Sequence, residues 1–166
     1  MKWFFRIAAC AGLLALTVPA GADTRAGKNA LDAKEYDKAV KELLPEAEKG
    51  DVEAIFLLGR MQQAGWGVPK DLKKAAEWFG KAAQLGHLES QKEYGAALAL
   101  GDGVEQDVNE GLKWLMIAAQ KGHEGAAQYA TQLAKHFPRN VIAAARRAAA
   151  EWNRQSKTDN ATTAPK

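Results

Sequence analysis

The fold is decided by the stretch GWGVPKD at residues 65–71, which returns 36 residues later as GDGVEQD at residues 101–107. The same spacing relates the flanking residues, so that segments 53–88 and 89–124 agree at twelve of 36 aligned positions. Ordinary composition would give about two or three such matches. A period of this length is typical of stacked repeat arrays, in which each unit packs only on its neighbours.

Apolar residues at helical spacing fill the segments between these glycine-rich turns. Asp51, Asp71 and Asp107 stand where a helix N-cap is expected, and Gly86 and Gly122 stand just beyond helix ends. The predicted helices cover residues 24–34, 36–48, 51–64, 72–85, 88–100, 108–121, 125–136 and 138–154. The prediction is an all-α solenoid of about eight helices in antiparallel pairs, spanning residues 23–155. Its full repeats cover 51–86 and 87–122, between degenerate capping pairs.

Four residues inside the repeats predict how neighbouring helices pack. Trp78 and Trp114 share a helix face with recurring alanines, which predicts two interlocking indoles in the core. Gly59 and Gly95 fall in mid-helix, where glycine costs up to about 1 kcal/mol relative to alanine. Their recurrence predicts a point where two backbones cross. Pro45 is expected to kink the second helix or unwind its last turn.

Both ends of the chain lie outside the predicted solenoid. Residues 1–22 combine the basic Lys2 and Arg6 with an apolar run at 7–20 and an A-x-A site at 20–22, the pattern of a signal peptide. That run is shorter than the ~20 residues of a membrane-spanning helix, so we expect cleavage and no stable membrane insertion. The expected location is periplasmic or secreted. Residues 156–166 are polar and free of aromatic residues, which predicts a disordered tail.

Charge and cysteine content narrow the function. Cleavage removes two of the 23 basic residues and none of the 20 acidic ones, which leaves a formal charge of +1. Nucleic acid is therefore not an expected partner, because it requires a concentrated basic surface. Cys10, the only cysteine, leaves with the signal peptide, so packing alone must hold the mature fold.

The repeated residues resemble the Sel-one-like repeat (SLR) family of tetratricopeptide-like α-solenoids. The pattern is carried in the first copy by Ala54, Leu58, Gly59, Gly65, Gly67, Val68, Asp71, Trp78, Ala82, Ala83 and Gly86. The resemblance covers about residues 34–136. It implies an adaptor whose first helices line a concave groove for a protein or peptide. A cysteine-rich branch of the family is linked to β-lactam binding, but the mature chain lacks the cysteines on which that analogy depends.

No catalytic or cofactor motif is complete. His87 and His123 follow C-cap glycines on successive layers roughly 10 Å apart, too far to share one metal ion, and we interpret them as turn residues. The G-x-G turns lack a preceding strand and a third glycine, as nucleotide binding would require. We therefore predict a non-enzymatic protein without cofactor or metal. The alternative is an envelope enzyme acting on cell-wall or β-lactam-like substrates through an unrecognised site.

One face of the first helices varies from copy to copy while the architecture stays constant. This face predicts the partner-binding residues Leu57, Arg60, Glu89, Glu93, Tyr129 and Gln132. Trp66 is a further candidate, because its counterpart is Asp102 and the fold does not demand an indole there. Two alternatives stay open: the face is only a solvated surface, and Trp66 packs back on its own loop.

Export has a direct test. The protein recovered from a native envelope fraction should begin at Asp23, or at Gly21 if cleavage follows the sequence VPA at 18–20. N-terminal sequencing decides this, and intact Met1 on cytoplasmic protein would rule out the expectation.

Overall fold

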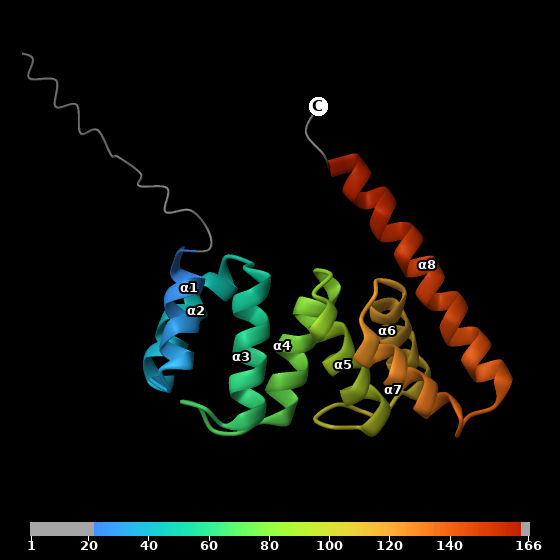
Figure 1. Cartoon of the computed structure of the whole chain (residues 1–166), viewed down its shortest axis with the longest axis horizontal. Helices are drawn as coiled ribbons and strands as arrows, with labels where there is room; N and C mark the ends of the chain where they lie inside the picture. The colour runs from blue at the N-terminus through green and yellow to red at the C-terminus, as the bar shows by residue number, and fades with distance from the viewer. Residues whose placement is uncertain (1–21, 164–166) are drawn as a thin grey trace, which may run out of the picture.

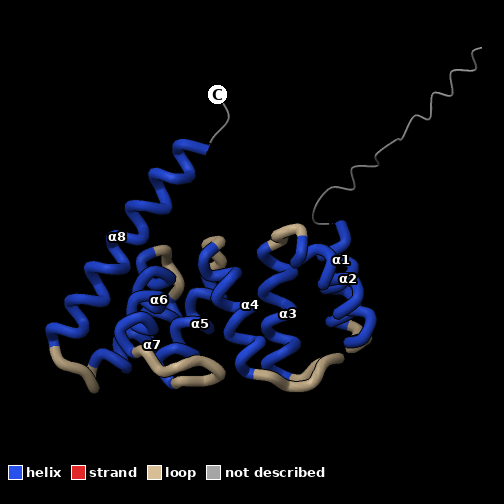
Figure 2. Tube along the Cα trace, turned by 180° about the vertical axis from the view of Figure 1, so that it is seen from behind, coloured by secondary structure: helices blue, strands red, loops and turns tan. Residues whose placement is uncertain are grey.

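The chain is an all-α solenoid, and the computed structural model describes its residues 22–163 (Figure 1). The predicted signal peptide therefore lies almost entirely outside the described residues. Figure 2 shows that this part of the chain contains helices and loops but no strand. The helices are α1 (Ala22–Asp32), α2 (Tyr36–Glu48), α3 (Val52–Ala64), α4 (Leu72–Gln84), α5 (Leu88–Leu100), α6 (Val108–Gln120), α7 (Glu124–Ala134) and α8 (Arg139–Thr163).

Helices α1 to α6 form three antiparallel pairs that stack side by side in one row, and each second helix also packs on the first helix that follows it. The predicted fourth pair does not form, because α8 packs on α6 rather than on α7. The long glycine-rich loops lie along one edge of this row, and the short turns from α2 to α3, from α4 to α5 and from α6 to α7 lie along the other (Figure 2). Asp51, Asp71 and Asp107 accept the predicted capping bonds, from backbone N–H groups 2.8–3.0 Å away. Gly86 and Gly122 have positive φ angles of 92° and 93°, as expected of residues that end a helix.

Each glycine-rich loop also joins its layer to the layer before it. Gly67 and Gly103 have φ angles of 67° and 74°, which favour glycine. A Cβ atom on Gly67 would lie 2.7 Å from the carbonyl carbon of Tyr36, at the start of α2. A Cβ atom on Gly103 would overlap the backbone of Leu72, which begins α4. The second glycine of each loop therefore allows the loop to rest on the previous second helix.

The two repeated tryptophans are not equivalent, contrary to the prediction of two interlocking core indoles. Trp114 is 3% exposed, and its ring centroid lies 4.9 Å from that of Trp152 on α8. Trp78 is only half-buried, with the Lys81 ammonium 4.6 Å from its ring centroid, and the neighbouring Phe79 fills the core instead. The difference arises because α8 packs against α6 and covers Trp114.

The mid-helix glycines differ in the same way. A Cβ on Gly95 would lie 2.9 Å from the carbonyl oxygen of Gly111, so the predicted backbone crossing is correct there. A Cβ on Gly59 would instead meet the ring of Phe79, so that glycine makes room for a side chain.

The last turn of α2 does not unwind at Pro45, which was one of the two expected effects of this proline. The helix continues to Glu48, and backbone bonds from the next turn still reach the carbonyls of Pro45, Glu46 and Ala47. Helix α8 runs on to Thr163, through most of the segment predicted as a disordered tail. Extending an existing helix costs far less than starting one, so a polar segment can remain helical. Among the described residues, no helix is both long and apolar enough to cross a membrane.

The unequal burial of the two indoles predicts unequal effects on stability. Trp114→Ala should lower the free energy of unfolding by about 3–5 kcal/mol, because it empties a fully buried site. Trp78→Ala should cost clearly less, since water already reaches that ring. Chemical denaturation followed by circular dichroism measures both, and equal losses would contradict this account of the core.

The loop glycines allow a matched comparison. Gly86→Ala introduces only the strain of a positive φ, about 1–2 kcal/mol, because nothing lies within 4 Å of the new methyl group. Gly103→Ala adds to that strain an overlap with the backbone of Leu72, so it should destabilise the protein more. Thermal melting of the two variants tests whether the contact between the loop and α4 holds the layers together. Similar melting temperatures would show that it does not.

Candidate partner-binding surface

The predicted partner-binding residues lie on the first helices α3, α5 and α7, but one of them is not at the surface. Leu57 is 7% exposed and belongs to a core cluster with Ala30 of α1 and Leu43 of α2. Helix α1 packs against α3 as well as α2, and so covers the turn that carries Leu57. Leu57 is therefore a core residue, which corrects its assignment to an exposed face.

Three residues occupy the same place on successive first helices and can be reached by a partner. Arg60 and Gln132 are exposed, and Ala96 between them is half-buried. The guanidinium carbon of Arg60 lies 5.9 Å from the ring centroid of Phe56 on the same helix. The same position of the repeat therefore carries a cation at Arg60, a methyl group at Ala96 and an amide at Gln132, on three neighbouring layers.

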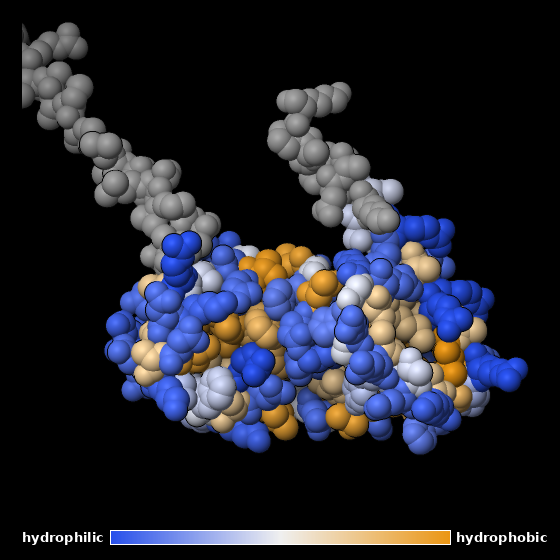
Figure 3. Space-filling view, in the orientation of Figure 1, coloured by the Kyte–Doolittle hydropathy of each residue, from blue (hydrophilic) through white to orange (hydrophobic). Residues whose placement is uncertain are grey.

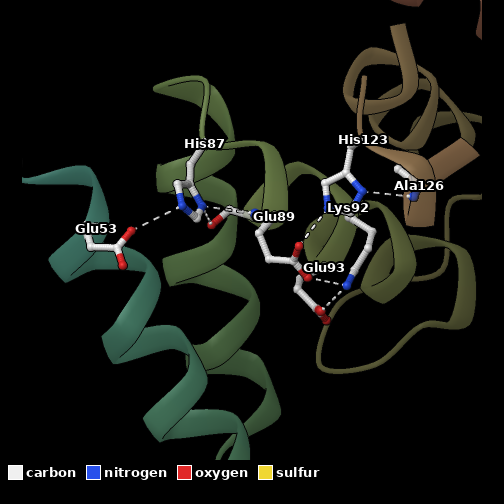
Figure 4. Close-up of polar contacts among 8 residues, drawn as sticks. Glu53, His87, Glu89, Lys92, Glu93, His123 and Ala126 are labelled. Carbon is white, nitrogen blue, oxygen red and sulfur yellow. Dashed lines mark hydrogen bonds and ion pairs between the residues drawn. The ribbon is translucent and has the colours of Figure 1, made fainter. Parts of the chain in front are cut away.

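The middle of the surface is acidic. Glu89 and Glu93 share a single cation, with the Lys92 ammonium bonded to Glu89 and 3.0 Å from Glu93 (Figure 4). Burial opposes ionisation of Glu89, but hydrogen bonds from Lys92 and His123 outweigh it and lower the pKa of that carboxyl. Two glutamates beside one lysine give the centre of the surface more acidic than basic groups.

The repeated histidines have a second role that the sequence reading missed. Their Nδ1 atoms cap α5 and α7, accepting the backbone N–H groups of Ser90 and Ala126 at 3.2 Å. Their Nε2 atoms reach back to the preceding layer, where His123 lies 2.7 Å from Glu89 and His87 lies 3.5 Å from Glu53 (Figure 4). Both glutamates also recur at the 36-residue spacing, and this was the signal that could have revealed the bridges.

These bridges hold the N-terminal ends of α3, α5 and α7 together. Searched for metal sites, the described residues contain no group of three or more His, Cys, Asp or Glu side chains placed to hold an ion. The contacts seen for His87 and His123 are those of capping and layer-bridging residues.

Tyr129 and Trp66 both have structural contacts. Tyr129 is half-buried beside a core cluster, and burial, followed by the carboxylate of Asp102, raises the pKa of its hydroxyl. Trp66 does not pack only on its own loop, because its ring stacks on Tyr36 of the preceding pair at 5.5 Å with 8° between the planes. At least one face of that indole is therefore unavailable to a partner.

A recess opens between α3, α4 and α5. It has a volume of about 170 Å³, with Phe79 in its lining. Leu72 and Leu100, also in the lining, are 37% and 58% exposed. In Figure 3, hydrophobic atoms emerge along the lower edge below α4 and α5, between hydrophilic neighbours. The other lining residues are Gln63, Ala75, Ala76, Glu93, Ala96, Ala97 and Asp102.

Comparison with known proteins identifies the repeat. A family model described as the Sel1 repeat matches residues 52–87 and 88–123. No curated protein matches the sequence.

Two solved structures share the fold. One is c5321, a protective antigen of uropathogenic Escherichia coli with an SLR fold; it matches with a TM-score of 0.78 and 24% identity over 89% of this chain and 33% of the antigen. The present chain thus spans a third of that antigen's length. A Sel1 repeat protein from Oxalobacter formigenes matches with a TM-score of 0.64 and 29% identity, over 69% of this chain and 89% of that protein. The two matched repeats and the shared solenoid show that the chain carries Sel1 repeats in an SLR-type fold.

Proposed function

We propose that this chain is an exported, non-catalytic interaction module that holds a protein or peptide partner across the first helices α3, α5 and α7. Sel1 repeats generally form scaffolds for protein–protein interaction, which supports the broad class. The proposal of export rests on the basic and apolar pattern of residues 1–22 and its A-x-A site.

The proposal rests on a contrast between the contacts that connect the layers, which recur, and the exposed surface of the first helices, which varies. Capping aspartates, loop glycines and histidine bridges recur from layer to layer. The accessible position occupied by Arg60, Ala96 and Gln132 changes its chemistry at each step. A surface that varies on a fixed frame is suited to selecting one partner from many.

The charge of the surface indicates the kind of partner. Glu89 and Glu93 outnumber the lysine they share, and Asp102 adds a third carboxylate near Tyr129. Leu72 and Leu100 offer apolar area beside them. Complementarity therefore favours a partner that presents a basic residue next to apolar anchors.

Site-specific photo-crosslinking tests the surface directly. A photoreactive phenylalanine analogue placed at position 60 or 132 should crosslink an envelope protein in intact cells. The same analogue at positions 73 and 84 on α4, where Lys73 and Gln84 are also exposed, should not. Equal crosslinking from both helices would move the binding surface away from the first helices.

A charge-matched pair of variants then measures the affinity for the captured partner. Gln132→Lys should weaken the binding of a partner that presents a basic residue, whereas Gln84→Lys on α4 should leave it unchanged. Both positions are exposed, so each change should alter stability by no more than about 0.5 kcal/mol. Failure to crosslink any partner from positions 60 and 132 would return the question to the alternative of an envelope enzyme.

A further inference from the structure

The recess between α3, α4 and α5 is lined by small side chains at places where the neighbouring layers carry larger ones. The 36-residue period allows each lining residue to be compared with its equivalents in the same chain. In the preceding layer, Tyr36, Met61 and Trp66 stand where the recess has Leu72, Ala97 and Asp102. In the following layer, Tyr129 and Leu133 stand where the recess has Glu93 and Ala97.

In the preceding layer an aromatic pair covers this place. The indole of Trp66 stacks on the ring of Tyr36, and both rings pack against a core cluster in which Met61 is fully buried. The chain therefore shows which chemistry fits the space: a flat ring lying against the start of the second helix. Stacked rings bury a large apolar area in a fixed geometry.

In the following layer the chain fills the place with Tyr129 and Leu133, which are partly buried against the core cluster of Leu115 and Ala130. The middle layer has neither solution. Its small residues Ala96 and Ala97 leave the space open down to Phe79, which is 2% exposed. The volume of about 170 Å³ is close to that of an apolar cavity, about 150 Å³, that holds a benzene molecule.

The rim of the recess carries negative charge. Glu93 and Asp102 both line it, and Lys92 is shared between Glu93 and Glu89. A guest entering here would place the group next to its ring beside these carboxylates. Opposite charge at that point favours binding, and a carboxylate would be repelled.

We propose that this recess receives an aromatic side chain of the partner protein, and that a basic residue adjacent in the partner's sequence pairs with Asp102 and Glu93. The guest ring takes the place that Trp66 and Tyr36 occupy in the preceding layer. This inference rests on the proposed function, because it names the anchor by which the partner is held on the first helices.

Dipeptide probes and amide NMR spectra of the mature protein test the recess without knowledge of the partner. N-acetyl-Trp-Lys-amide should shift the amide signals of Ala96, Ala97 and Asp102. N-acetyl-Leu-Lys-amide and N-acetyl-Trp-Glu-amide should bind about tenfold more weakly or worse, since they lack the ring or the cation. Equal binding of the leucine probe would refute an aromatic guest, and shifts confined to other residues would refute the site.

Variants taken from the chain's own neighbouring layers provide the controls. Leu72→Tyr with Asp102→Trp, or Ala97→Leu alone, should close the recess and weaken the tryptophan probe at least about tenfold. The double variant should melt no lower than the wild type, which shows that it folds. Asp102→Asn should keep ring binding but reduce the preference for the lysine probe, whereas Glu105→Gln, an exposed carboxylate of the same loop, should not. Unchanged probe binding after closure would overturn the proposal.

The outcomes separate this inference from the proposed function. If the crosslinked partner binds the closed variants as tightly as the wild type, the anchor assignment is wrong while the interaction surface stands. If the wild type binds the dipeptide but no partner crosslinks at positions 60 and 132, the proposed surface fails while the recess stands. Probe signals that shift with protein concentration alone would identify a second copy as the occupant and overturn the partner assignment.

Discussion

The structure depends on the close approach between each glycine-rich loop and the start of the previous second helix. No side chain fits between Gly67 and Tyr36, or between Gly103 and Leu72, so the backbones meet directly. Such a joint fixes the spacing of two layers without using any variable side chain. Two backbones in contact also leave little freedom for the layers to rotate, which makes the array a stiff frame.

The histidine bridges reinforce this frame at the opposite ends of the first helices. His123 caps α7 through one ring nitrogen and pairs with Glu89 of the preceding layer through the other. One residue thus satisfies an unpaired helix N–H group and ties two layers. Capping the helix and pairing with the preceding layer both serve the contact between layers. The exposed turns of α3, α5 and α7 can therefore differ from layer to layer, and we propose that the partner binds there.

The two ends of the array are closed in different ways. At the N-terminal end, α1 packs on both α2 and α3 and draws Leu57 into the core. At the C-terminal end, the Phe137-Pro138 connection replaces a glycine-rich loop, and α8 packs on α6 with Trp152 against Trp114. A terminal unit must cover apolar surface that would otherwise face water, so it departs from the repeat. The same departure gives the two repeated tryptophans their different burial.

The period, the first three helix pairs, the aspartate caps and the positive-φ glycines could all be predicted from the sequence. Each of these features is a local requirement of the chain, and its repetition at a fixed spacing makes it recognisable in the sequence. Tertiary structure alone decided which surface residues are accessible. The burial of Leu57 and the difference in burial between Trp78 and Trp114 depend on α1 and α8, which break the repeat. The recess likewise arises from small side chains on α5 that face α3 and α4 across an interface. Burial is set by whatever lies opposite, and no pattern within one helix contains that information.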